Sequence, residues 1–203
     1  MDEHLETTYQ RLHEFYTSDR QLPWDDPLPP PEVIDLLAGQ IPGRALDVGC
    51  GYGRASIYMA RLGWEVDGVD FMPQAAAVAA TRARDAGVDA RFHIASVTDL
   101  GFLGGSYQFI LDVGCAHALN VEGFHQYYNH IKRLLTTGRI FLIYVRLREE
   151  GEDAPQEGPR GMPEESVRAT FSDGFELYKV ERGITEVEGM EPWQSAWFYF
   201  RKV

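Results

Sequence analysis

Short apolar runs alternate with helix-spaced apolar residues through most of the chain. Runs with strand character cover residues 45–48, 65–70, 90–95, 109–112 and 140–145. Amphipathic helices are predicted between them over residues 54–62, 73–86 and 122–135. This alternation is typical of an α/β domain with a doubly wound parallel sheet.

The N-terminal region precedes this pattern. Leu5, Tyr9, Leu12 and Tyr16 recur at helical spacing, which predicts an amphipathic first helix. Residues 22–31 contain five prolines and cannot continue it, so they are predicted as a connector. A short helix is predicted over residues 32–38.

The C-terminal region differs in composition. Residues 149–163 are rich in Glu, Gly and Pro, which predicts a mobile surface loop that borders the functional site. Residues 175–183 and 195–202 have aromatic and β-branched strand character. We expect these two strands to pair as a hairpin.

Length and charge narrow the possible functions. A chain of 203 residues with 44% hydrophobic and 25% charged residues fits one domain over residues 1–203. A net charge of −12 disfavours nucleic acid as a partner and favours a small molecule. The start has no secretion signal and no run approaches the roughly 18 apolar residues of a membrane span, which predicts a cytoplasmic protein without membrane partners. Its two cysteines are predicted to be free thiols, and the oligomeric state stays open.

A glycine-rich turn follows the first strand. Gly49, Gly51 and Gly53 allow the backbone to turn tightly and to approach a ligand. The dinucleotide fingerprint needs a glycine at the sixth position, where Arg54 stands, so an NAD-dependent dehydrogenase is disfavoured. Asp47 lies just before the turn, where its carboxylate either stabilises the turn or binds a ligand amino group.

Three further residues follow strands. Asp70 ends the second strand, roughly 20 residues beyond the glycines, where a carboxylate binds ribose hydroxyls or caps the next helix. His117 follows the fourth strand and either takes a proton near neutral pH or bonds the loop backbone. Cys115 is predicted as a small packing residue. No metal site is predicted.

Residues 46–53, 68–70 and 112–117 together resemble class I methyltransferases that use S-adenosylmethionine (SAM). The resemblance implies a Rossmann-like seven-stranded sheet, mostly parallel, with an antiparallel C-terminal hairpin strand. It implies that Asp47 and Gly49 lie near the methionine part of SAM, that Asp70 holds the ribose, and that Phe71 and Met72 flank the adenine. The cofactor-binding residues that it implies are Asp47, Gly49, Cys50, Gly51, Asp70, Phe71, Met72, Ser96, Val97 and Asp112. Ser96 departs from the family, which commonly has an acidic residue there.

Within that superfamily, residues 23–25, 63–66 and 195–199 are similar to the small thiol, thiopurine and tellurite-type methyltransferases. This similarity implies that residues 1–40 form a lid and connector over the cofactor, with Tyr9, Tyr16 and Trp24 as lid candidates unless they pack only in the core. The expected function is methyl transfer from SAM to a thiol, chalcogen or heteroaromatic nucleophile of a small molecule. The alternative is a SAM-binding regulatory or scaffold protein without turnover.

Overall fold

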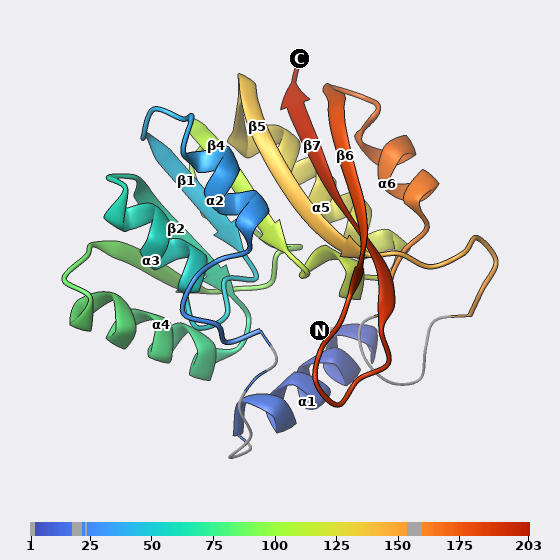
Figure 1. Ribbon diagram of the computed structural model, residues 1–203, viewed down its shortest axis with the longest axis horizontal. Helices are drawn as coiled ribbons and strands as arrows, with labels where there is room; N and C mark the ends of the chain where they lie inside the picture. Colours follow the sequence, from blue (N-terminus) through green and yellow to red (C-terminus); the bar gives the residue numbers. More distant parts are fainter. Residues whose placement is uncertain (1–2, 18–21, 23, 154–159) are drawn as a thin grey trace.

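The computed structural model describes residues 3–17, 22, 24–153 and 160–203 and has one seven-stranded sheet at its centre (Figure 1). The strand order is β3-β2-β1-β4-β5-β7-β6; β3 to β5 run parallel, and β7 is antiparallel to β5 and to β6. The strands are β1 (Arg44–Val48), β2 (Glu65–Asp70), β3 (Ala90–Ile94), β4 (Tyr107–Val113), β5 (Leu135–Arg146), β6 (Phe175–Thr185) and β7 (Trp193–Lys202). This sheet confirms the predicted fold class, including the antiparallel C-terminal hairpin.

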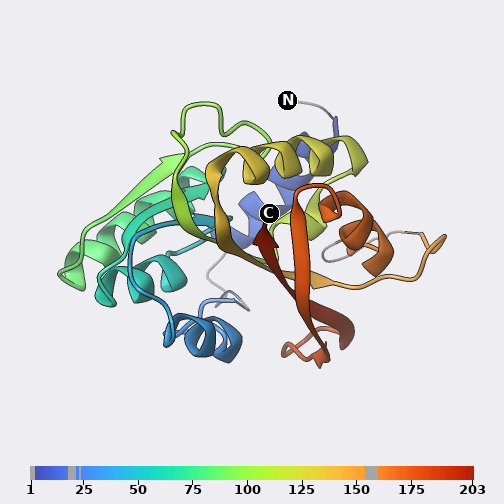
Figure 2. The same cartoon turned by 90° about the horizontal axis from the view of Figure 1, so that it is seen from above.

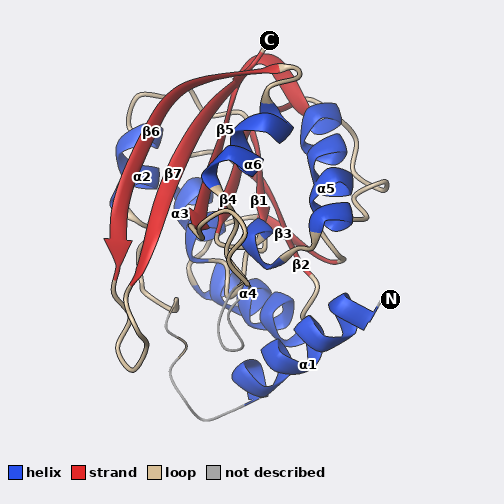
Figure 3. Cartoon of the chain, turned by 90° about the vertical axis from the view of Figure 1, so that its right-hand side faces the viewer, coloured by secondary structure: helices blue, strands red, loops and turns tan. Residues whose placement is uncertain are grey.

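Helices cover both faces of the sheet (Figure 2). One face packs against α2, α3 and α4, and the other packs against α5 and α6. The helices are α1 (Glu3–Thr17), α2 (Pro31–Leu37), α3 (Arg54–Arg61), α4 (Pro73–Asp85), α5 (Val121–Leu134) and α6 (Glu164–Phe171), with a short 3₁₀ turn, η1, at Ala116–Ala118. Helix α1 belongs to neither layer and crosses beneath the edge where the parallel strands end (Figures 1 and 3).

Aromatic packing fixes the C-terminal half. The ring of Phe171 in α6 lies 5.1 Å from that of Phe141 in β5 and 4.9 Å from that of Phe200 in β7, centroid to centroid. All three side chains are fully buried. Since aromatic pairs add stability beyond the area they bury, this cluster ties α6 to the sheet and sets the position of the hairpin.

The predicted helices and strands are confirmed to within a few residues, with two differences. Strand β5 begins at Leu135, directly after α5, and a register irregularity beside Tyr107 accommodates the extra residues. Helix α6 was not predicted; Pro163 precedes it and Val167 and Phe171 are its two buried residues. Residues 154–159 of the predicted 149–163 loop lie outside the described residues.

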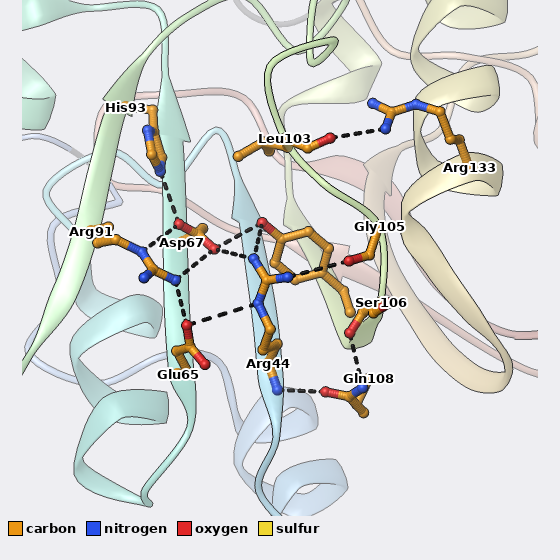
Figure 4. A network of polar contacts seen from close by, with 11 residues as sticks. Arg44, Glu65, Asp67, Arg91, His93, Leu103, Gly105, Ser106, Gln108 and Arg133 are labelled. Carbon is orange, nitrogen blue, oxygen red and sulfur yellow. Dashed lines mark hydrogen bonds and ion pairs between the residues drawn. The ribbon is translucent and has the colours of Figure 1, made fainter.

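A polar cluster connects four strands away from the sheet's carboxyl edge (Figure 4). The buried Asp67 carboxylate of β2 accepts hydrogen bonds from Arg44 at 3.1 Å, Arg91 at 2.9 Å and Tyr107 at 2.8 Å, and lies 2.9 Å from His93 Nε2. These partners hold the pKa of Asp67 well below its ordinary value, against the effect of burial. The cluster connects β1 to β4 and has a structural role. The candidate functional residues lie instead at the carboxyl edge of the sheet.

Among the described helices, none is long and apolar enough to cross a membrane.

Candidate functional site

A cavity of about 710 Å³ lies at the edge where the parallel strands end. Its volume is within the range of about 300–1,000 Å³ typical of small-molecule sites. The order of the strands reverses between β1 and β4, and ligands of open α/β sheets bind at such a reversal. Described residues of α1 and of the connector line this cavity, and Figure 3 shows α1 below the sheet.

The turn after β1 forms one wall of this cavity. Gly49 and Gly51 have φ angles of 68° and 53°, in the left-handed region that favours glycine. A Cβ on Gly49 would lie 2.4 Å from Cβ of Cys115, whereas a Cβ on Gly51 would lie 3.5 Å from the Tyr16 hydroxyl. Gly49 is therefore required for packing against the β4 turn, and Gly51 lies open towards Tyr16 and Trp24.

Asp47 and Asp70 lie side by side behind the turn. Asp70 accepts backbone N–H bonds from Gly51 and from Met72, both at 2.9 Å. Asp47 accepts a 2.6 Å bond from the Ser56 hydroxyl. Neither carboxylate forms an ion pair with another described residue. Burial raises the pKa of Asp47 to about 6 and raises that of Asp70 as well, so both sites would gain from a cationic ligand.

Residues expected around the adenine divide into two groups. Phe71, Ser96 and Val97 line the cavity, and the Ser96 hydroxyl lies 2.7 Å from that of Thr98. Met72 is fully buried and does not line the cavity, because its side chain turns into the protein at the start of α4. Flanking of the adenine by the Met72 side chain is therefore not supported.

Asp112 also lies away from the cavity. Its fully buried carboxylate accepts bonds from the amides of Cys115 at 2.7 Å and Ala116 at 3.0 Å, and from the Tyr127 hydroxyl at 2.8 Å. Burial raises its pKa to about 7 despite these bonds. We had expected Asp112 to bind the cofactor; in the structure it organises the turn that carries His117.

His117 lines the cavity, but its geometry does not suit a general base. Its Nδ1 accepts the backbone N–H of Arg146 at 2.9 Å, which leaves the proton of the neutral ring on Nε2. Burial, together with the nearby charges of Arg146 and Arg11, lowers the pKa of His117 to about 3. The neutral ring is thus a hydrogen-bond donor and not a base at neutral pH, and its backbone partner is Arg146 of β5 rather than its own loop.

The predicted lid residues occupy different positions. Tyr16 and Trp24 line the cavity with ring centroids 6.2 Å apart, and Tyr16 also packs on Tyr52 at 5.4 Å. Tyr9 lies outside the cavity lining and meets the edge of Phe71 at 5.8 Å. Residues 18–21 and 23 of the predicted lid and connector lie outside the described residues, as does the side chain of Leu5.

The sequence did not indicate the far wall of the cavity. It is formed by the strand-end and hairpin residues Tyr144, Ile184, Val187, Met190, Trp193 and Trp197, together with Arg11 from α1. A signal was present in the aromatic residues at alternate positions of β7, which place Trp193 and Trp197 on one face. The described residues of the 149–163 loop do not line the cavity, so the expectation that this loop borders the site is not supported there.

Both cysteines are free thiols, as predicted. Cys50 is buried and Cys115 is half-buried, and burial raises the pKa of both thiols. Neither is therefore poised as a thiolate nucleophile. In the described part of the chain, no three His, Cys, Asp or Glu side chains gather as a candidate metal-ligand set.

Comparison with known proteins finds a matching family model and a curated relative. Residues 45–138 match a family model described as a methyltransferase domain. A 2-heptyl-1-hydroxyquinolin-4(1H)-one methyltransferase from Mycobacteroides abscessus is 29% identical over 125 residues, which cover 61% of this chain and 55% of that protein. The chain thus matches little more than half the length of this relative.

Solved structures share the fold over most of the chain. A structure from work on the conversion of a disulfide bond into a thioacetal group during echinomycin biosynthesis has a TM-score of 0.79 at 23% identity, covering 96% of this chain and 92% of the other. TehB from Haemophilus influenzae has a TM-score of 0.75 at 19% identity, covering 85% and 62%. The N-methyltransferase NodS from Bradyrhizobium japonicum, in complex with S-adenosylhomocysteine, has a TM-score of 0.76 at 15% identity, covering 96% and 98%.

These structural similarities establish the fold, and the matched domain and the curated relative point to the same chemistry. Residues 45–138 thus match a methyltransferase domain, and the sheet order and these neighbours give the chain the Rossmann-like fold of class I SAM-dependent methyltransferases.

Proposed function

We propose that this chain transfers the methyl group of SAM to a nucleophilic oxygen or sulfur of a small, apolar, aromatic molecule. The observation that carries the proposal is the composition of the 710 Å³ cavity. One end holds the glycine turn and two buried carboxylates, and the other is walled by aromatic and aliphatic side chains of β5 and the β6–β7 hairpin. A cofactor and an apolar acceptor therefore have separate, adjoining places.

The residues at the first end fit SAM, which carries a sulfonium and an ammonium. Asp47 and Asp70 are buried carboxylates without an ion-paired partner among the described residues, and a bound cation would offset their burial. Gly51 has room for a ligand to approach its backbone. We therefore propose that Asp47 faces the methionine ammonium, that Asp70 accepts bonds from the ribose hydroxyls, and that Phe71 and Val97 contact the adenine.

Methyl transfer requires alignment more than acid–base groups. When bound, SAM supplies an electrophilic methyl carbon, and the acceptor attacks it in line with the departing sulfur. The protein contributes by holding the two reactants in contact and by excluding water. The apolar wall of Tyr144, Trp193 and Trp197 suits this role, since its aromatic faces orient a flat acceptor.

The same wall discriminates between the acceptor classes that the sequence left open. A small chalcogen oxyanion would bury its charge against mainly apolar side chains and leave much of that surface without contact. The Mycobacteroides abscessus relative is named for a hydroxyquinolone, a heteroaromatic acceptor with an alkyl chain. Both observations support an aromatic or heteroaromatic acceptor over tellurite or selenite.

A screen of labelled-methyl transfer tests the proposal. We expect transfer to hydroxyquinolones, phenols, thiophenols or thiopurines, and none to selenite or tellurite. The variant Asp70→Ala serves as the matched control, because lost cofactor binding should abolish every signal that depends on this site. Calorimetric binding of SAM without methylation of any acceptor would instead support a SAM-binding regulatory protein, and binding of NAD but not SAM would refute the assignment.

A further inference from the structure

Positive groups and hydrogen-bond donors gather at the acceptor end of the cavity, opposite the carboxylates. Arg11 reaches this end from α1, and His117 reaches it from η1 after β4. The two carboxylates, Asp47 and Asp70, lie at the ends of β1 and β2. Two buried carboxylates and Arg54 thus lie at the cofactor end of the cavity, and Arg11, His117 and Glu186 also line the cavity.

The hydrogen on His117 Nε2 is fixed by the fold. A backbone N–H can only donate, so the 2.9 Å bond from Arg146 N to Nδ1 keeps the Nδ1 lone pair occupied. The backbone turn that carries His117 donates two amide hydrogen bonds to the Asp112 carboxylate, which fixes the position of this turn. The imidazole thus presents a neutral N–H donor in a fixed orientation.

The backbone of Gly114 lies close to this donor. A Cβ at position 114 would lie 3.6 Å from Nε2 of His117, 3.2 Å from its Cε1 and 3.6 Å from the Tyr144 ring. Gly114, His117 and Tyr144 all line the cavity. A side chain at position 114 would therefore press on the imidazole and on the Tyr144 ring, so glycine at this position lets both rings keep their places in the cavity wall.

Two arginines lie close enough to His117 to lower its pKa, and Glu186, between β6 and β7, lines the same cavity. From β5 come Arg146 and the phenol of Tyr144, and from α1 comes Arg11. On its own turn, Asp112 is turned inwards onto backbone amides and the Tyr127 hydroxyl, which compensate its charge. A negative charge beside Nε2 would be stabilised by the donor and by both arginines.

We propose that His117 and Arg11 are specificity-determining residues that bind the acceptor as an anion, a phenolate-like oxygen or a thiolate on an aromatic ring. The Nε2–H of His117 donates to the anionic atom, and the Arg11 guanidinium balances its charge. The acceptor loses its proton to water on binding, so the methyl transfer itself needs no base. This inference rests on the proposed function, because it assigns the chemistry of the same acceptor.

The atoms and electrons of the step balance without a further reactant. A lone pair of the anionic oxygen or sulfur forms the bond to the methyl carbon. The bond from that carbon to the sulfonium sulfur breaks, and its electron pair stays on sulfur, which leaves neutral S-adenosylhomocysteine. His117 keeps its proton throughout and acts by orienting and stabilising the anion.

Para-nitrophenol tests the proposal without turnover, because its anion absorbs visible light and its neutral form does not. The dye is titrated with pH in the presence of this chain saturated with S-adenosylhomocysteine. We expect the wild type to favour the bound anion about tenfold or more, which lowers the apparent pKa of the dye by about one unit. Arg11→Gln and His117→Leu should each remove most of this preference.

Conservative variants separate the proposed roles from a structural one. Arg11→Lys keeps the charge and His117→Gln keeps a donor and an acceptor, so both should retain most of the preference. Arg54→Gln removes another cavity-lining arginine at the cofactor end and should leave the pKa of the dye unchanged. Because Arg11 is not fully buried, we expect Arg11→Gln to fold. It therefore still tests the proposal if His117→Leu does not fold.

Two outcomes overturn the inference. One is a wild-type protein that does not lower the pKa of the dye, whether it binds the neutral form or none at all. The other is an Arg54→Gln effect as large as that of Arg11→Gln, which would make the preference a property of general cavity charge. If S-adenosylhomocysteine binds by calorimetry while the dye is not shifted, only this inference fails; if it does not bind, the proposed function fails first.

Discussion

Asp47→Asn tests whether the buried negative charge at position 47 destabilises the free protein and is neutralised by a cationic ligand. Asp47 is only 3% exposed, and its one side-chain partner is the Ser56 hydroxyl at 2.6 Å. An asparagine oxygen can accept the same bond, so the substitution removes the charge and retains the packing. We therefore expect the variant without ligand to be more stable than the wild type above neutral pH, and to bind SAM less tightly.

The magnitude follows from the pKa of Asp47, which burial raises from 3.8 to about 6. That difference corresponds to about 3 kcal/mol of folding free energy. Because the folded state holds the proton more tightly than the unfolded state, Asp47 does not destabilise the fold below pH 3.8. Its destabilising effect grows as the pH rises from 3.8 to about 6 and is complete above about pH 6. The stability gain of Asp47→Asn should therefore approach 3 kcal/mol at about pH 8 and vanish near pH 4.

Urea unfolding at several pH values measures this difference. Burial also raises the pKa values of Asp70 and Asp112, and both groups titrate in the variant and in the wild type. The informative quantity is therefore the difference in unfolding free energy between variant and wild type at each pH. Asp67→Asn is the matched control with the opposite sign. The pKa of Asp67 is depressed by its arginine, tyrosine and histidine partners, so its stabilisation is present above the unfolded pKa and is lost on acidification. Its removal should cost about 1.5–3 kcal/mol at neutral pH.

Calorimetry supplies the second half of this test. Loss of a charge-assisted contact to the SAM ammonium should weaken binding by about 1.5–3 kcal/mol. An Asp47→Asn variant that is no more stable at pH 8 and binds SAM as well as the wild type would refute the reasoning. A variant that is more stable with unchanged affinity would show that the buried charge is real but that SAM does not use it.

Three further predictions concern the same cavity. Asp70→Ala should weaken SAM binding by about 1.5–3 kcal/mol in calorimetry while the circular dichroism spectrum is kept; unchanged affinity would exclude Asp70 from the site. Gly49→Ala should destabilise the fold in urea unfolding far more than Gly51→Ala, because only at Gly49 would the new Cβ collide, at 2.4 Å, with Cβ of Cys115; equal losses would contradict the geometry of the turn. Amide exchange in α1 should slow when S-adenosylhomocysteine is added, and equal exchange would make α1 a packing element only.

The sheet could be predicted because its signals are local. Apolar runs of four to six residues and intervening amphipathic helices appear directly in the sequence, and they correspond to β1–β5 and α3–α5. Helix α6 was missed because it has eight residues and only Val167 and Phe171 face the core. Its stability comes from contacts with β5 and β7, which no local pattern reveals.

The positions of Asp47, Gly49 and Asp70 in the cavity wall were predictable, because they depend on the strand and turn that each residue occupies. Asp47, Gly49 and Asp70 lie at strand ends, and parallel strands bring such ends together. The state of His117 was not predictable, because it depends on the Arg146 amide, 29 residues further along the chain. The same holds for Asp112, whose inward position depends on Tyr127 of α5 and on the turn it caps.

A common physical logic links the two ends of the cavity. The buried carboxylates at one end favour a cation, and the neutral His117 N–H and the Arg11 guanidinium at the other favour an anion. In the proposed reaction a sulfonium cation and an acceptor anion become two neutral products, so charge decreases towards the transition state. A water-poor, apolar cavity favours such charge loss, provided that binding groups first hold both ions in place. The side chains of Trp193 and Trp197 in the hairpin wall would then accelerate transfer by excluding water from the two reacting ions.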